Sequence, residues 1–142
     1  LTHDLKECEY IAMVRFEGPL FFANASYLED KIMELMGTKT NLKHIIIVSN
    51  GINDIDASGE ETLSLLVDRI RSAGIDISLS GVNESVMKVF ERTHFKEKIG
   101  ENHIYPTMER AVCEVQEHAH RGGTEKDCPL ITVCRLSYDS EN

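Results

Sequence analysis

The sequence predicts an α/β domain in which about four to five strands alternate with about four helices. Residues Lys43–Asn50 contain four consecutive apolar side chains, a pattern that favours a strand covered on both faces. An amphipathic helix is expected from Ser58 to about Ala73, and another strand, Ile75–Ser80, follows Gly74 at once. Such a strand–helix–strand unit predicts two parallel strands joined by a right-handed crossover.

Two short apolar stretches come before this central unit. Tyr10–Phe16 is a strand candidate, and the Gly18-Pro19 pair after it favours a turn. The apolar run Leu20–Ala23 is interpreted as a short second strand or as an extended entry to a helix. That helix is expected to end at Met36, before Gly37.

The start of this first helix is expected near Asn24 or Ser26. Ser26 and Glu29 have the spacing of a capping box, in which a hydroxyl and a carboxylate satisfy free backbone N–H groups. Ser58 and Glu61 repeat that spacing at the start of the central helix. Both pairs therefore predict helix starts.

After the central unit the chain alternates again. Asn83 is a good cap for a short helix that ends near Thr93, and a connector follows from Phe95 to Gly100. His103–Tyr105 is predicted to be a last short strand. A final helix should begin at Pro106-Thr107.

The strand Ile75–Ser80 has its own pattern. Apolar residues alternate along it with Asp76, Ser78 and Ser80. This alternation predicts a strand with one packed face and one wetter face.

Composition limits the classes of partner. The formal net charge is −9, the opposite of what binding to a nucleic-acid backbone requires, so we expect no nucleic-acid partner. No apolar run approaches the roughly 20 residues that cross a bilayer. The cysteines Cys8, Cys113, Cys128 and Cys134 have no metal-binding or redox spacing, and we expect reduced thiols.

The most specific candidate site is Asp56-Ala57-Ser58-Gly59, at the N-terminus of the longest predicted helix. Phosphate on Ser58 would meet free backbone N–H groups and the positive end of the helix dipole. The structural alternative is that Ser58 only caps the helix with Glu61. The acidic residues nearby would also repel a phosphate: Asp54, Asp56, Glu60 and Glu61.

Other chemistry finds little support in the sequence. The acidic residues around Asp54 lack the spacing of a calcium loop, so no metal site is predicted. Neither nucleotide-binding glycine motif occurs, and Ser58 lies in no nucleophile frame, so no catalytic residue is predicted.

Two stretches together resemble one family. Arg15–Ala25 resembles the opening of STAS domains from SulP (sulfate permease-like) anion transporters, and its specific residues are Gly18, Pro19, Phe21, Phe22 and Asn24. The signature loop shared by STAS domains, including free anti-sigma factor antagonists, is similar to Asp54, Asp56, Ser58 and Gly59.

The resemblance implies a STAS fold, with a mixed sheet and helices packed mainly against one face. It implies a STAS domain over residues 8–120, and residues 121–142 are then a carboxy-terminal tail of unassigned order. The implied role is non-enzymatic regulation, on the cytoplasmic face of the membrane, of a transport domain in the same chain. The implied contacts, with that domain and with a cytosolic regulatory protein, would lie around residues 51–62. A homodimer would form through the parent transporter, and the start at Leu1 fits an excised domain.

Two alternatives remain open at this stage. The first is a free signalling protein like the anti-sigma factor antagonists, in which the loop serine accepts phosphate from a kinase. Ser58 matches the position of that serine. The acidic pair Glu60-Glu61 departs from the pattern of those antagonists. The second and weaker one is a nucleotide-binding domain, which would make a nucleotide the cofactor.

Overall fold

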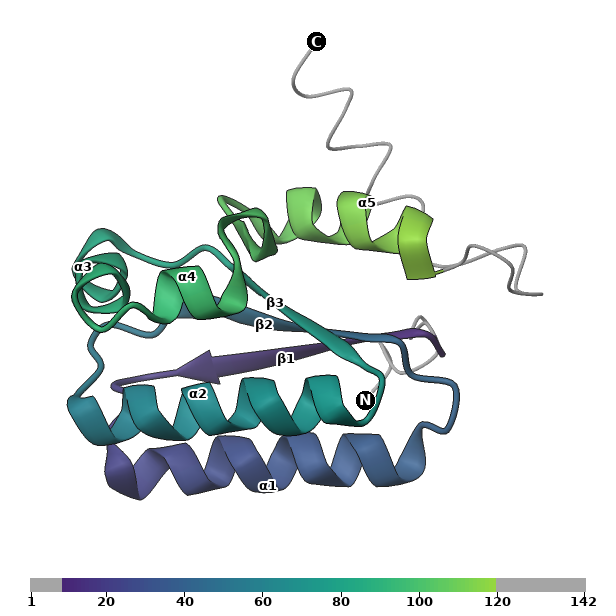
Figure 1. The fold of residues 1–142 in the computed structure, drawn as a ribbon, viewed down its shortest axis with the longest axis horizontal. Coiled ribbons are helices and arrows are strands. Elements are labelled where there is room, and N and C mark those ends of the chain that lie inside the picture. The colour runs from purple at the N-terminus through teal and green to yellow at the C-terminus, as the bar shows by residue number, and fades with distance from the viewer. Residues whose placement is uncertain (1–8, 120–142) are drawn as a thin grey trace, which may run out of the picture.

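The structure is a computed structural model that describes residues 9–119, with side chains to Val115 (Figure 1). The predicted tail at 121–142 therefore lies outside the described residues. The strands are β1 (Ile11–Glu17), β2 (His44–Gly51), β3 (Asp76–Ser80) and β4 (Ile104–Tyr105). The helices are α1 (Phe22–Thr38), α2 (Ala57–Ser72), α3 (Glu84–Arg92), α4 (Phe95–Ile99), the short 3-10 helix η2 (Glu101–His103) and α5 (Met108–Ala119).

The four strands form one sheet in the order β1-β2-β3-β4. The parallel pairing of β2 with β3 confirms the central unit read from the sequence. The other two pairings are parallel as well, so the sheet of residues 9–119 is wholly parallel where a mixed one was expected. Helices α1 and α2 lie side by side on one face, and α5 crosses the other (Figure 1).

Two apolar clusters hold these layers together. The larger one packs α1 to α4 against one face of the sheet, with Ile47, Leu66 and Phe90 among its members. The smaller one packs α5 against the opposite face through Ile46 and Val112. Strand β2 is covered on both faces because its side chains alternate between the clusters. Most helices therefore share one face, as the resemblance implied.

The segment before α1 takes the second of its two predicted forms, but the helix begins two residues before the earlier predicted start, Asn24. Leu20 makes only an isolated parallel bridge with Ile55, and the helix already begins at Phe22. The entry to α1 is therefore extended rather than a full strand. Ser26 lies inside α1, and Phe21 takes the N-cap position without a side-chain hydrogen bond, so the first predicted capping box is wrong.

The face of β3 predicted to be wetter is buried instead. Ser78 and Ser80 are fully buried because α5 covers this face of the sheet. Ser78 Oγ and His44 Nε2 lie 2.7 Å apart and share a hydrogen bond. The alternating pattern could not reveal this, since a helix late in the chain supplies the cover.

The elements after β3 agree with the prediction only in part. Asn83 caps α3, with its side chain accepting a hydrogen bond from Val86 N at 2.9 Å, as predicted. The expected connector after Thr93 forms the short helix α4. Cys113 is disulfide-bonded, which corrects the expectation of a reduced thiol at this position.

Asp76, the first residue of β3, joins several elements. Its two carboxylate oxygens accept hydrogen bonds from Arg71 Nε at 2.9 Å and from His103 Nε2 at 2.8 Å, and Oδ1 also accepts one from Ile77 N. Arg71 also donates to the carbonyls of Lys98 and Ile99. Burial alone would raise the pKa of Asp76, but these hydrogen bonds outweigh it and lower the pKa to about 2.

We predict that Asp76→Asn lowers the free energy of unfolding at pH 7. Because the pKa of Asp76 is lower in the folded than in the unfolded state, its charge stabilises the fold above pH 3.8. That contribution is lost as the pH falls through about 2. Urea unfolding of both proteins over this range should show the difference shrinking with falling pH. A difference that is constant across the range would contradict this assignment.

Candidate functional site

The two stretches that carry the family resemblance lie against each other. Gly18 N donates to Gly51 O at 2.8 Å, and Leu20 N donates to Asp54 O at 2.9 Å. Leu20 and Ile55 also form a parallel bridge. The segment 18–24 therefore runs alongside the signature loop, although about thirty positions separate them in the sequence.

Gly59 is the point of closest approach between these stretches. A Cβ added to this residue would lie 1.9 Å from Leu20 O and 2.9 Å from the Leu20 carbonyl carbon. No side chain fits there without moving the backbone of the neighbouring segment. The glycine of the signature loop is thus explained by a contact with the other recognised stretch rather than by an unusual backbone angle.

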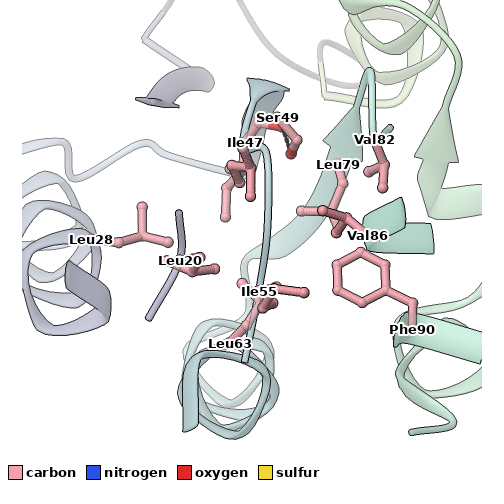
Figure 2. Close-up of a pocket in the computed structure, with 11 residues that line it drawn as sticks. Leu20, Leu28, Ile47, Ser49, Ile55, Leu63, Leu79, Val82, Val86 and Phe90 are labelled. Carbon is pink, nitrogen blue, oxygen red and sulfur yellow. Dashed lines mark hydrogen bonds between the residues drawn. The ribbon is translucent and has the colours of Figure 1, made fainter. Parts of the chain in front are cut away.

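Beneath the loop lies a small apolar cavity, shown in Figure 2. Leu20, Ile55 and Leu63 line it from one side, and Val86 and Phe90 line it from α3. The cavity has a volume of about 10 Å³, near the minimum for one water molecule, and its apolar lining offers few partners. The space is part of the core and not a ligand site.

Asp56, not Ser58, caps α2. Its Oδ1 accepts a hydrogen bond from Gly59 N at 2.7 Å, and its carbonyl accepts one from Glu60 N at 2.9 Å. The predicted capping box of Ser58 and Glu61 is therefore wrong. The sequence predicted Ser58 as the cap, two positions after the actual cap Asp56, because Asp and Ser are comparable N-cap residues.

Ser58 is left free by this arrangement. It is the second residue of α2, its side chain is exposed, and Oγ makes no hydrogen bond within residues 9–119. Asp54 and Glu61 beside it are exposed as well. Burial raises the pKa of Glu60 above its usual value, and Lys98 partly offsets this effect.

The specific segment has an anchored side and an exposed side. Asn24 Nδ2 donates to Pro19 O at 2.5 Å, which closes the turn before α1. Gly18 has a φ of +99°, a conformation that favours glycine. Phe21 is 38% exposed, and Phe22 is 73% exposed at the first position of α1.

Helices α1 and α2 run in parallel with a fixed stagger. Near the start of α2, Gly59 touches Leu20, which lies 39 positions earlier in the sequence. About three turns further along α2, Arg69 pairs with Glu29 at 3.1 Å, and these two residues are 40 positions apart. Phe22 is therefore level with about Thr62. Helical spacing places four residues along one stripe of α2: Ser58, Thr62, Leu65 and Arg69. This stripe lies on the side of α2 next to α1, because Arg69 binds Glu29 of α1.

We call the surface formed by Phe22, Ser26, Ser58, Thr62 and Leu65 the α1–α2 face. Leu65 is 54% exposed and lies beside the exposed Phe22, so the two form an apolar pair on the surface. The sequence analysis missed this residue, although Leu65 lies off the buried stripe of α2 and could have been noticed. The α1–α2 face thus contains two predicted site residues, Phe22 and Ser58, and one residue that was not predicted, Leu65.

A hollow at the carboxyl end of β1 and β2 is lined by Arg15, Asn50, Thr107 and Glu109, among others. Within residues 9–119 no group of three or more His, Cys, Asp or Glu is placed to hold a metal ion. Over the same range, none of the helices combines the length and the apolar character that spanning a membrane requires.

We predict that Asp56→Ala lowers the free energy of unfolding by about 0.5–2 kcal/mol, because it removes the cap of α2. Asp56→Asn should retain most of the stability, since Asn caps equally well. Ser58→Ala should change the free energy by less than about 0.5 kcal/mol, as expected for an exposed side chain without a partner. Equal losses for Ser58→Ala and Asp56→Ala in urea unfolding would contradict this assignment.

Comparisons with known proteins agree with this geometry. The family model described as STAS domain matches residues 3–111. Sulfate transporter 3.2 of Arabidopsis thaliana is 24% identical over 84% of this chain, which spans 20% of the length of that transporter. The SulP transporter STAS domain from Vibrio cholerae is 24% identical, with a TM-score of 0.68 over 81% of this chain and 88% of that one. A crystal structure from Thermotoga maritima, described as that of a putative anti-sigma factor antagonist, is 22% identical, with a TM-score of 0.63 over 73% of this chain and 86% of that one. The chain belongs to the STAS domain family, and its relatives include sulfate transporters of the SulP type.

Proposed function

We propose that this domain is a non-enzymatic regulatory module of a SulP-type sulfate or other anion transporter. It would act through protein contacts at the signature loop and helix start, residues 51–62. Its first partner would be the membrane transport domain of the same chain, on the cytoplasmic face of the membrane. A cytosolic regulatory protein would be a second partner.

The exposure of the signature loop, together with the family, carries this proposal. Asp54, Ser58 and Glu61 all point to solvent, whereas Leu20, Ile55 and Gly59 hold the same stretch in the core. A rigid backbone that presents exposed side chains suits a contact surface, because little conformational entropy is lost on binding. The Arabidopsis relative supports a transporter context, since a STAS-like region forms part of a sulfate transporter.

A second candidate function is favoured by the exposed Ser58. Its hydroxyl is accessible to a kinase, and it stands beside free N–H groups in the first turn of α2. The domain would then be a free signalling protein, switched by phosphate in the manner of an anti-sigma factor antagonist. Acidic Asp54 and Glu61 oppose that reading, because a phosphate beside them meets like charge.

The gene that encodes this chain separates the two candidates. A transporter module predicts about ten or more apolar spans of roughly 20 residues in the same reading frame, upstream of Leu1. An initiator Met within a few residues of Leu1 would contradict it and favour the free signalling protein.

A matched pair of variants in the full-length protein then tests the regulatory role. Ser58→Arg places a bulky side chain on the contact surface, and we expect a lower rate of sulfate uptake into vesicles at equal protein amount. Ser85→Arg is the control, because Ser85 is also exposed and is also the second residue of its helix, α3. Equal rates for both variants would contradict a role for this surface.

A further inference from the structure

We propose that the α1–α2 face binds a positively charged amphipathic helix of a partner protein, which sets its apolar side chains on Phe22 and Leu65. This inference rests on the proposed function and adds the chemistry of the partner. It concerns one surface, formed by the first two turns of α1 and the first three of α2.

The apolar part of the surface is compact. Phe22 is 73% and Leu65 is 54% exposed, and the stagger of the helices puts Leu65 level with Ser26, one turn along α1 from Phe22. Only small polar side chains, Ser26, Ser58 and Thr62, lie on the same surface. Two large apolar anchors separated by small residues suit a helix whose own side chains repeat every three to four positions.

Carboxylates outnumber cations around this surface. Glu61 is exposed one turn before Leu65, Asp30 is exposed one turn after Ser26, and Asp54 is exposed just ahead of α2. These carboxylates surround the two apolar anchors. A partner segment bearing Lys or Arg would find complementary charge at each of these positions.

The cations of the two helices do not compensate this charge. Within α1 and α2 the basic residues are Lys31, Arg69 and Arg71. Arg69 pairs with Glu29, and Arg71 binds Asp76 and the end of α4. Lys31 is nine positions from Phe22, which places it on the opposite side of α1. An acidic partner or an anionic membrane surface would therefore be repelled.

A transport domain offers partners of this chemistry. The cytoplasmic loops of membrane proteins carry an excess of Lys and Arg. A basic amphipathic helix at the edge of such a domain would meet the acidic rim of the α1–α2 face. The net charge of −9 on the whole chain favours the same encounter at long range.

Nuclear magnetic resonance titration of the isotope-labelled 142-residue chain tests this inference. The probe is a synthetic amphipathic helix of about 18 residues, or roughly five turns, composed of Leu and Lys. We expect shifts of backbone amide signals confined to residues 22–30 and 54–66. The matched probe with Glu in place of Lys should cause none of them.

Variants separate specific docking from general attraction to an acidic protein. Phe22→Ala with Leu65→Ala should weaken binding of the Leu/Lys peptide about tenfold or more. Tyr27→Ala is the apolar control, since Tyr27 is 70% exposed on another side of α1. Glu61→Lys should weaken binding, and Glu109→Lys on α5, across the sheet, should not (Figure 1).

Shifts spread over the whole surface, or equal weakening by the control variants, would overturn the inference. So would equal binding of the Glu-containing peptide. Such a failure would leave the transporter proposal standing, because that proposal is tested by the reading frame and by sulfate uptake. Conversely, a reading frame without membrane spans would reject the transporter while leaving the peptide result intact.

Discussion

The approach of Gly59 to the carbonyl of Leu20 is the contact on which the functional part of this domain depends. A hydrogen atom at the α-carbon lets the start of α2 lie directly on the backbone of the segment before α1. The hydrogen bond from Leu20 N to Asp54 O and the bridge to Ile55 hold the same two stretches together. Every other feature of the candidate surface follows from this alignment.

The first consequence is the division between buried and exposed residues. Leu20 and Ile55 enter the core from the joined stretches, so their neighbours in sequence are turned outward. Phe22 and Ser58 lie in the first turns of the helices that follow these stretches, and both are exposed. The second consequence is the parallel stagger of α1 and α2, which the pair of Arg69 and Glu29 maintains three turns further on.

Patterns within single elements were predictable from the sequence. The run of apolar residues in β2 and the cap at Asn83 follow from local rules of burial and hydrogen bonding, and the structure confirms both. The family resemblance is confirmed by the match over residues 3–111. The sequence located these two stretches but did not predict the contact between them.

Features that depend on distant parts of the chain were not predictable. The polar face of β3 is buried because α5 returns across it, and no local pattern around Ser78 reports that helix. The cap of α2 was misassigned because Asp56 and Ser58 are equally suitable by type, and only the backbone decides between them. The α1–α2 face arises between two helices, so no sequence pattern within either one defines it.

Comparison of Gly59→Ala with Gly37→Ala tests the central contact most directly. Both glycines lie within helices, so helix propensity alone predicts that each change to alanine stabilises the protein, by up to about 1 kcal/mol. Gly37 has open space around it, and its substitution should follow that expectation. Gly59→Ala should instead lower the free energy of unfolding by about 1–3 kcal/mol or more, because its methyl group meets the Leu20 carbonyl. Stabilisation by both substitutions in urea unfolding would contradict the account.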